Sequence, residues 1–121
     1  MTALEELREK VAAGVFPADL SNRDLGWDVA ILTPYEAFSG SLDAALALHN
    51  AVLPGWMFLI RSSDDADVTR LGCRSGDFLA NVWPLGTSPN MGGEHYHIWA
   101  QPASRAWLLA ILDALIAQEK Q

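Results

Sequence analysis

The sequence predicts a single domain, residues 1–121, of the mixed α/β (α+β) class, in which helices and a small sheet pack as a layered α/β/α sandwich. Half of the 121 residues are hydrophobic, which is enough to bury a core without a metal or a disulfide. Apolar residues recur at helical spacing in some stretches and alternate in others. We expect about four helices, including a long apolar C-terminal helix, and a mainly antiparallel sheet of three to four strands.

Residues 41–61 carry the clearest local signals. Ser41 is expected to cap a helix because its hydroxyl can accept from a free amide one turn ahead, and Pro54-Gly55 ends that helix. The strand that follows, residues 56–61, is apolar on both faces, so we expect both faces to be covered. The helix should bury one stripe, made of Leu42, Ala45, Leu46, His49 and Val52.

Two helices are predicted before this segment. Residues 3–13 carry apolar side chains at helical intervals, with charged side chains between them. Ser21 and Asp24 form the pattern of a capping box, which begins a second helix. We expect that helix to continue through residues 27–33, where alternating apolar residues leave a strand as the alternative. Residues 34–40 would then connect it to the next helix.

The second half of the chain predicts strands separated by turns. Residues 62–77 are rich in turn formers and charge, so we expect a long exposed connection with a short strand at residues 68–73. Residues 78–83 and 94–100 are predicted strands. Between them, the glycines and prolines of residues 85–93 predict a mobile surface loop.

The last predicted helix, residues 104–119, is apolar over most of its surface. Ser104 is its expected N-cap. A helix of this composition is either central to the core or packed against another subunit. We therefore consider Trp107, Leu108 and Ile111 as an oligomer interface.

Charge and cysteine content narrow the function classes. The net charge is −7 and no Lys/Arg cluster offsets it, so we expect no nucleic-acid binding. The longest apolar stretch is far shorter than the roughly 20 residues that cross a membrane, so we expect no membrane association. Cys73 is the only cysteine, which is typical of a reducing compartment and predicts a cytoplasmic location.

His95 and His97 are the residues with the most suggestive spacing. They stand two apart on a predicted strand, so their side chains share a face and could bind zinc or another divalent metal. A metal site usually needs a third ligand, and nothing in the sequence places the candidates His49, Asp77 and Glu94 near the pair, since Glu94 points to the opposite face of a regular strand. Trp99 shares the same face, which makes His95, His97 and Trp99 our first choice for a ligand or partner surface.

Other combinations predict chemistry less well than ordinary structure. Cys73 stands between Arg70 and Arg74, whose charges would favour a thiolate, but no base accompanies it. Two further groups contain triad or calcium-ligand residue types: Ser41, Asp43 and His49, and Asp64, Asp65 and Asp67. Helix capping and the helix dipole explain Ser41 and Asp43, and a solvated turn explains the three aspartates. We therefore expect no catalytic residues.

Residues 38–48, FSGSLDAALAL, resemble the central motif of the phage ABA sandwich domain family, small proteins of tailed phages and prophages. Pro54-Gly55-Trp56 is similar to the family's turn into a strand, and Val82-Trp83-Pro84 to its strand end. The resemblance implies an α/β/α sandwich of unknown role, with no catalytic residues to transfer. This chain differs from the family in residues 85–93, in its His-Tyr-His strand and in its bulkier last helix.

We accordingly expect a phage or prophage accessory protein that acts by protein association, as a homo-oligomer or with another protein, and virion association stays open. One alternative is a small metal-binding protein or metal-dependent hydrolase that uses His95 and His97. Another is an acidic inhibitor of a host protein.

Overall fold

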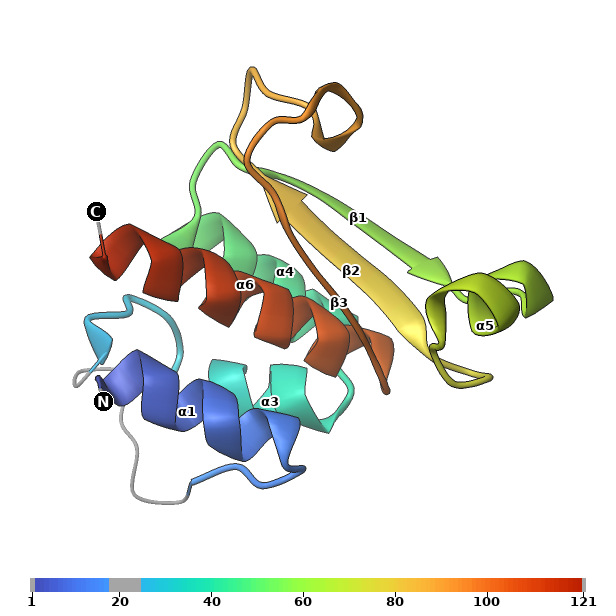
Figure 1. Ribbon diagram of the computed structural model, residues 1–121. Coiled ribbons are helices and arrows are strands. Elements are labelled where there is room, and N and C mark those ends of the chain that lie inside the picture. The colour runs from blue at the N-terminus through green and yellow to red at the C-terminus, as the bar shows by residue number, and fades with distance from the viewer. Residues whose placement is uncertain (1, 18–24, 121) are drawn as a thin grey trace.

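The computed structural model describes residues 2–17 and 25–120, and it confirms the mixed class, with helices packed on a three-stranded antiparallel sheet (Figure 1). The described elements are, in chain order, α1 (Ala3–Ala12), α3 (Thr33–Ser39), α4 (Leu42–Val52), β1 (Met57–Ser62), α5 (Asp65–Leu71), β2 (Phe78–Trp83), the 3₁₀-helix η1 (Pro89–Met91), β3 (Tyr96–Ala100) and α6 (Ala103–Glu119).

The sheet has the order β1-β2-β3, with β2 in the middle and both pairs antiparallel. Ala80, at the centre of β2, is paired with Ile60 on one side and Ile98 on the other. All three side chains point to the same face because paired residues in a ladder lie on one side of the sheet. This face carries the contacts to the helices.

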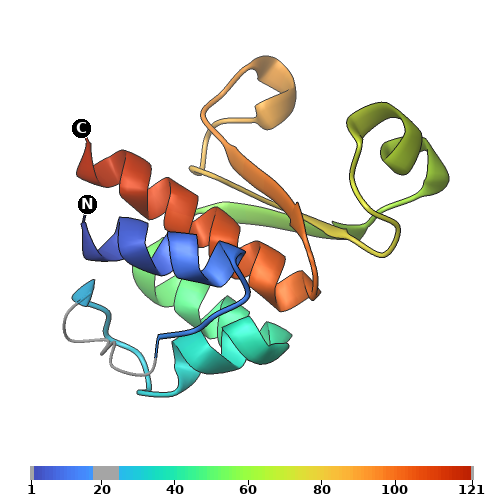
Figure 2. The ribbon, with the colours of Figure 1, turned by 60° about the horizontal axis from the view of Figure 1, so that its bottom comes forward.

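Helix α6 packs along all three strands on this face, and α1, α3 and α4 pack against α6 in turn. Figures 1 and 2 show these four helices together on one side of the sheet. The order of layers therefore differs from the expected α/β/α sandwich: α6 lies between the other helices and the sheet. Among the described elements, no helix packs along the opposite face of the sheet.

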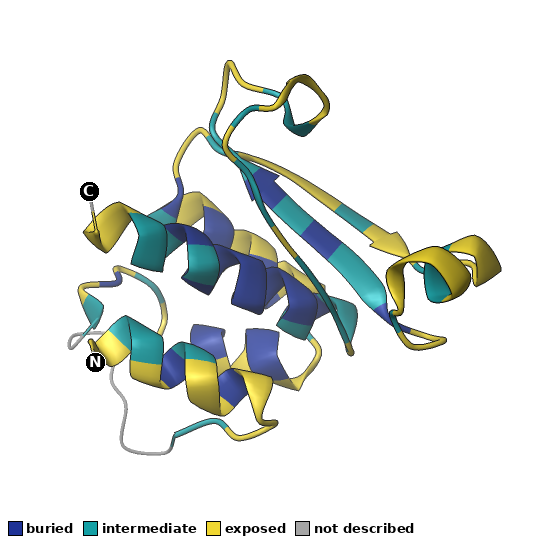
Figure 3. Ribbon diagram, viewed as in Figure 1, coloured by how far each residue is buried: buried dark blue, intermediate teal, exposed yellow. Residues whose placement is uncertain are grey.

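The apolar composition of α6 follows from this central place. Seven consecutive residues, 106–112, are buried, which spans nearly two helical turns and thus every side of the helix (Figure 3). Trp107 is 4% exposed, and Leu108 and Ile111 are fully covered. The expectation that these three residues form an oligomer interface is wrong, because they belong to the core of the chain itself.

Ser104 is not the cap of α6. Pro102 occupies the N-cap position, and no side chain caps this helix end. Ser104 is 1% exposed and its Oγ has no hydrogen-bond partner among the described residues.

Ser41 caps α4 as expected, since its Oγ accepts from the amide of Ala44 at 3.1 Å. The buried stripe of α4 is turned relative to the expected one, and it consists of Ala44, Ala45, Leu48 and His49. Leu42 and Leu46 are 48% and 38% exposed. The difference arises because α4 packs between α3 and α6, which buries the small alanines where helices approach closely.

The connector expected at residues 34–40 is helix α3, whose first turn contains Pro34. Proline fits the first turn of a helix because the amide hydrogen that it lacks would have no partner within the helix there. The helix expected at residues 27–33 is absent from the described residues, and Trp27 instead packs into the core from an irregular segment. Ser21 and Asp24 lie outside the described residues.

The strand expected at residues 68–73 is also wrong, because this region forms helix α5. Asp64 caps it by accepting from the amide of Asp67 at 2.8 Å, while the Asp67 carboxylate accepts from the amide of Asp64 at 3.0 Å. This reciprocal pair is a capping box with aspartate in both positions. Gly72 ends the helix with a φ of +71°, a left-handed conformation that favours glycine.

Candidate functional site

The candidate site is the sheet face turned away from α6, which we call the open face. Alternation along β2 sends Ala80 and Val82 towards the helices, where both are fully buried, and sends their neighbours to the other side. The strand register, extended by one row to residue 95, arranges the open face in three rows of three: Met57, Trp83 and His95; Leu59, Asn81 and His97; Arg61, Leu79 and Trp99.

Five of the nine residues of the open face are apolar, and the face is partly accessible. Met57 is 44% exposed and Leu59 is 42% exposed, while Leu79, Trp83 and Trp99 are half-buried. None of the nine residues is acidic, although the chain contains 15 Asp and Glu residues. The carboxylates of the described residues therefore lie outside these nine positions.

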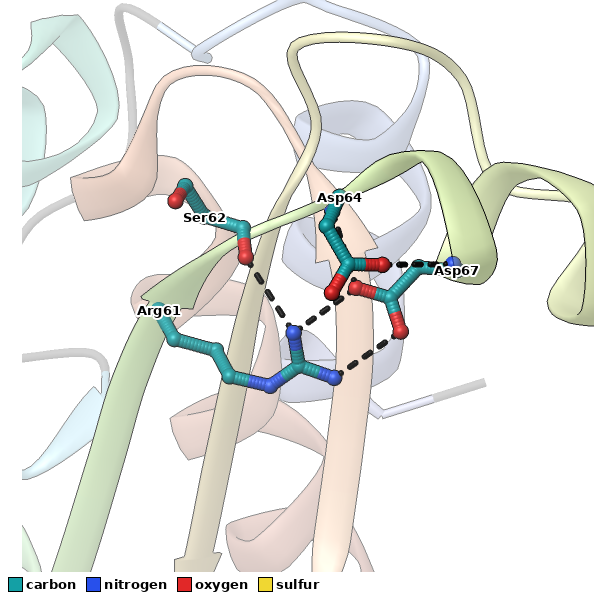
Figure 4. Close-up of polar contacts among 4 residues, drawn as sticks. All are labelled: Arg61, Ser62, Asp64 and Asp67. Atoms are coloured by element: carbon teal, nitrogen blue, oxygen red, sulfur yellow. Dashed lines mark hydrogen bonds and ion pairs between the residues drawn. The ribbon is translucent and has the colours of Figure 1, made fainter.

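Arg61 occupies one corner of the open face and links it to α5. Its Nη1 and Nη2 donate to the two carboxylate oxygens of Asp67 at 2.7 and 3.1 Å, and Nη1 also donates to the Ser62 carbonyl (Figure 4). The guanidinium carbon lies 5.1 Å from the ring centre of Trp99, close enough for a cation–π contact. Arg61 and the amide of Asp64 hold the pKa of Asp67 well below its usual range.

These contacts account for the aspartate cluster at residues 64–67. The carboxylates of Asp64 and Asp67 cap α5, and Asp67 also pairs with Arg61. Oxygen ligands already bound by a helix amide and a guanidinium are poorly placed to surround calcium. Asp64 and Asp67 therefore belong to a helix cap, where the sequence predicted a solvated turn.

His95 and His97 lie side by side, with ring centres 5.3 Å apart and ring planes inclined by only 14°. His97 is exposed, whereas Nδ1 of His95 is shielded from solvent and has no hydrogen-bond partner among the described residues. The nearest acidic residue in sequence, Glu94, accepts from the Tyr96 hydroxyl at 2.6 Å. Burial, together with this bond, raises the pKa of Tyr96 to about 12.

In the part of the chain that the structure describes, no group of three or more His, Cys, Asp or Glu side chains is placed to hold a metal ion. His95 and His97 thus supply two of the ligands that zinc requires, and the described residues bring no third one to them.

Asn81 occupies the centre of the open face, between Leu59 and His97. Its Oδ1 is shielded from solvent and has no hydrogen-bond partner among the described residues. An amide oxygen in this state costs free energy that a suitable donor would recover. The sequence shows an asparagine in a strand but not its unpaired oxygen, so sequence reasoning did not single it out.

His49 has a structural role in the core, on the side of the sheet that packs against α6, which we call the covered face. It is 1% exposed, its Nδ1 accepts from the indole N–H of Trp107 at 3.2 Å, and its Nε2 donates to the Trp56 carbonyl at 3.0 Å. These two bonds require the neutral Nε2–H tautomer, because a protonated ring could not accept from Trp107. Burial lowers the pKa of His49, although its bond to Trp56 opposes this shift.

The two other combinations of reactive residue types do not form sites. Ser41 and His49 serve as a helix cap and a core hydrogen-bonding residue. Cys73 is half-buried, and loss of solvation followed by the charges of Asp67 and Asp77 raises the pKa of its thiol. The arginines beside it in sequence therefore do not activate it, contrary to the effect considered from the sequence.

A cleft of about 800 Å³ lies between α1 and residues 15–17. Its polar lining residues are Glu6, Glu9 and Lys10, which are surface residues of one helix. It shares no residue with the open face.

Comparisons of the chain with protein-family models, with curated proteins and with solved structures find no match. The resemblance to the phage ABA sandwich family therefore stays a prediction. Among the described helices, none combines the length and the apolar character needed to span a bilayer.

Proposed function

We propose that the protein acts by association with another protein surface, and that the open face is its binding surface. The observation that supports this most is the combination of exposure and composition: Met57 and Leu59 are over 40% exposed on a face that also holds two tryptophans and no carboxylate. Exposed apolar faces of this kind cost solubility, and they commonly mark a binding surface.

The residue types of the open face match those that contribute most to protein interfaces. Trp, Arg and Met are enriched at the centres of interfaces, and Asp, Glu and Lys are depleted there. Trp83, Trp99 and Arg61 can each contribute a large contact area. The pairing of Arg61 with Asp67 also holds its side chain in place before a partner arrives, which reduces the entropy lost on binding.

Self-association takes place through this face rather than through the last helix, whose apolar residues fill the core. The outer edge of β1 is a second possible contact, since β1 pairs with β2 alone. By the resemblance of residues 38–48 to the phage ABA sandwich motif, we extend the proposal to a phage or prophage accessory role in the cytoplasm of a bacterial host. Flanking phage genes would support this extension, and a neighbourhood of housekeeping genes would contradict it.

Site-specific photo-crosslinking in cells that naturally express the gene tests the binding surface. A photoreactive residue at position 59 should give a discrete crosslinked product of any mass, because Leu59 lies near the middle of the open face. The same residue at position 47, on the exposed side of α4, is the matched control and should give none. Absence of a product from position 59, or equal products from both positions, would contradict the proposal.

A further inference from the structure

Building on the proposed function, we infer that the occupant of the open face is a second copy of this chain, packed sheet against sheet around a two-fold axis that passes over Asn81. The inference rests on the place and chemistry of Asn81. This residue lies at the centre of the three-by-three array, and its Oδ1 has no hydrogen-bond partner within the described residues of its own chain.

A side chain on a two-fold axis meets its own copy, so it must be complementary to itself. The carboxamide of asparagine meets this condition because it carries both a donor and an acceptor. After rotation about its side-chain bonds, Oδ1 of Asn81 can accept from Nδ2 of Asn81 of the partner subunit, and the reverse bond forms by symmetry. A single buried asparagine that pairs across a two-fold axis also fixes the register of a dimer.

The centre of the face is the part that least depends on the packing angle. Packed sheets cross at about 30° because each sheet is twisted. Rotation about the centre displaces the outer residues and leaves Asn81 opposite its copy. When the axis runs along β2, β1 of one copy lies over β3 of the other, which brings Arg61 near Trp99 of the partner subunit.

Charge permits this pairing in spite of the net charge of −7 on each copy. The open face contains Arg61 and no acidic residue, so no carboxylate is buried without a partner when two such faces meet. Exposed carboxylates such as those of Glu6, Glu9 and Asp65 remain in water, where salt screens their repulsion over about 8 Å.

The size of the face sets the expected strength. Three strands about 4.8 Å apart, rising about 3.4 Å per residue over six residues, cover roughly 300 Å² in projection. Even with the relief of the side chains, this area is below the roughly 800 Å² per partner of a standard interface. We therefore expect a dissociation constant in the micromolar range, roughly 1 to 100 μM.

Sedimentation equilibrium of the purified full chain between low and high micromolar concentration tests the inference. The wild type should pass from monomer to dimer. Asn81→Asp should weaken the dimer at least tenfold at neutral pH, since it places two carboxylates on the axis. The matched control is Asn50→Asp, which adds the same charge on the exposed side of α4 and should leave the dissociation constant unchanged.

A wild type that stays monomeric at all concentrations would overturn the inference. If position 59 still gives a crosslinked product in cells, the proposed function stands and the partner is a different protein. If the chain is monomeric and position 59 also gives no crosslinked product, the proposed function is contradicted too. A dimer that is insensitive to Asn81→Asp would overturn the placement of the axis. If thermal melting shows that Asn81→Asp is unfolded, Asn81→Leu replaces it in the test. Asn81→Leu should tighten the dimer because it removes a buried polar pair. An unchanged dissociation constant would contradict the pairing of the two asparagines.

Discussion

The two faces of the sheet are built by the same three strands, and they differ in what lies over them. On the covered face, Ala80 and Val82 of the central strand are fully buried beneath α6, whereas Phe58 on the edge strand is 41% exposed. On the open face, Met57 and Leu59 keep over 40% of their surface exposed, although they are as apolar as the residues of the covered face. Hydrophobicity in a strand thus does not specify burial within one chain. The covered face contributes to folding, whereas no described helix packs along the open face.

Introducing a carboxylate on each face should give the largest contrast. Val82→Asp places a charge under α6 without a partner, so we expect it to lower the free energy of unfolding by more than about 4 kcal/mol. Leu59→Asp, on the neighbouring strand of the open face, should cost less than about 1 kcal/mol. Urea denaturation measures both. Equal losses would mean that the two faces are equally buried.

The histidines provide a second contrast. His49→Leu removes the acceptor of the buried Trp107 indole and the donor to Trp56, so we expect a loss of about 2 to 4 kcal/mol at neutral pH. His97→Leu, on the open face, removes an exposed ring and should change stability by less than about 0.5 kcal/mol. Denaturant titration at one pH compares the two variants. A His49→Leu chain as stable as wild type would show that the hydrogen bonds of His49 contribute nothing.

The pH dependence of the free energy of unfolding should give a further test of the role of His49. The pKa of His49 is lowered in the folded chain, whereas in the unfolded chain it returns to about 6.5. Below pH 6.5 the unfolded state therefore binds more protons than the folded state, and the free energy of unfolding should fall as the pH decreases. Above pH 6.5 His49 should add nothing to the pH dependence of the free energy of unfolding. His49→Gln should reduce this slope. If His49→Gln keeps the slope of the wild type, the lowered pKa of His49 is not the cause of the pH dependence.

The smallest effect is expected at the corner of the open face. Arg61→Gln breaks an ion pair with Asp67 that lies in solvent, and such pairs contribute little to stability. We expect a melting temperature unchanged within error at physiological salt, while the dimer weakens. Thermal melting and sedimentation of the same sample measure the two effects. Unfolding of α5 in this variant would show that the ion pair is structural.

Local signals in the sequence predicted several elements well. The Ser41 cap, the alternation of β2 and the helical spacing of Leu7 and Val11 each depend on neighbours in the chain, and the structure confirms all three. The errors at α3 and α5 concern signals that have two meanings. Pro34 fits a helix stop as well as a helix start, and the aspartates at 64 and 67 fit a solvated turn as well as the capping box that they form.

The candidate site was predictable only in part, for a physical reason. Period-two alternation is enough to place His97 and Trp99 on one face of a strand. Whether a helix covers that face depends on contacts between distant segments, which alternation does not encode. For the same reason, Trp107 and Ile111 were assigned to an interface, because a helix that is apolar on all sides fits a subunit contact as well as a position between two layers.

The most direct test of the account is the accessibility of a thiol on each face, measured in a Cys73→Ser background at a protein concentration low enough to give monomers. We predict that the thiol of Leu59→Cys reacts with a maleimide nearly as fast as free cysteine, and that the thiol of Ala80→Cys reacts at least tenfold more slowly because α6 covers it. Protection of position 59 equal to that of position 80 would show that the open face is covered within the monomer, and it would contradict the account.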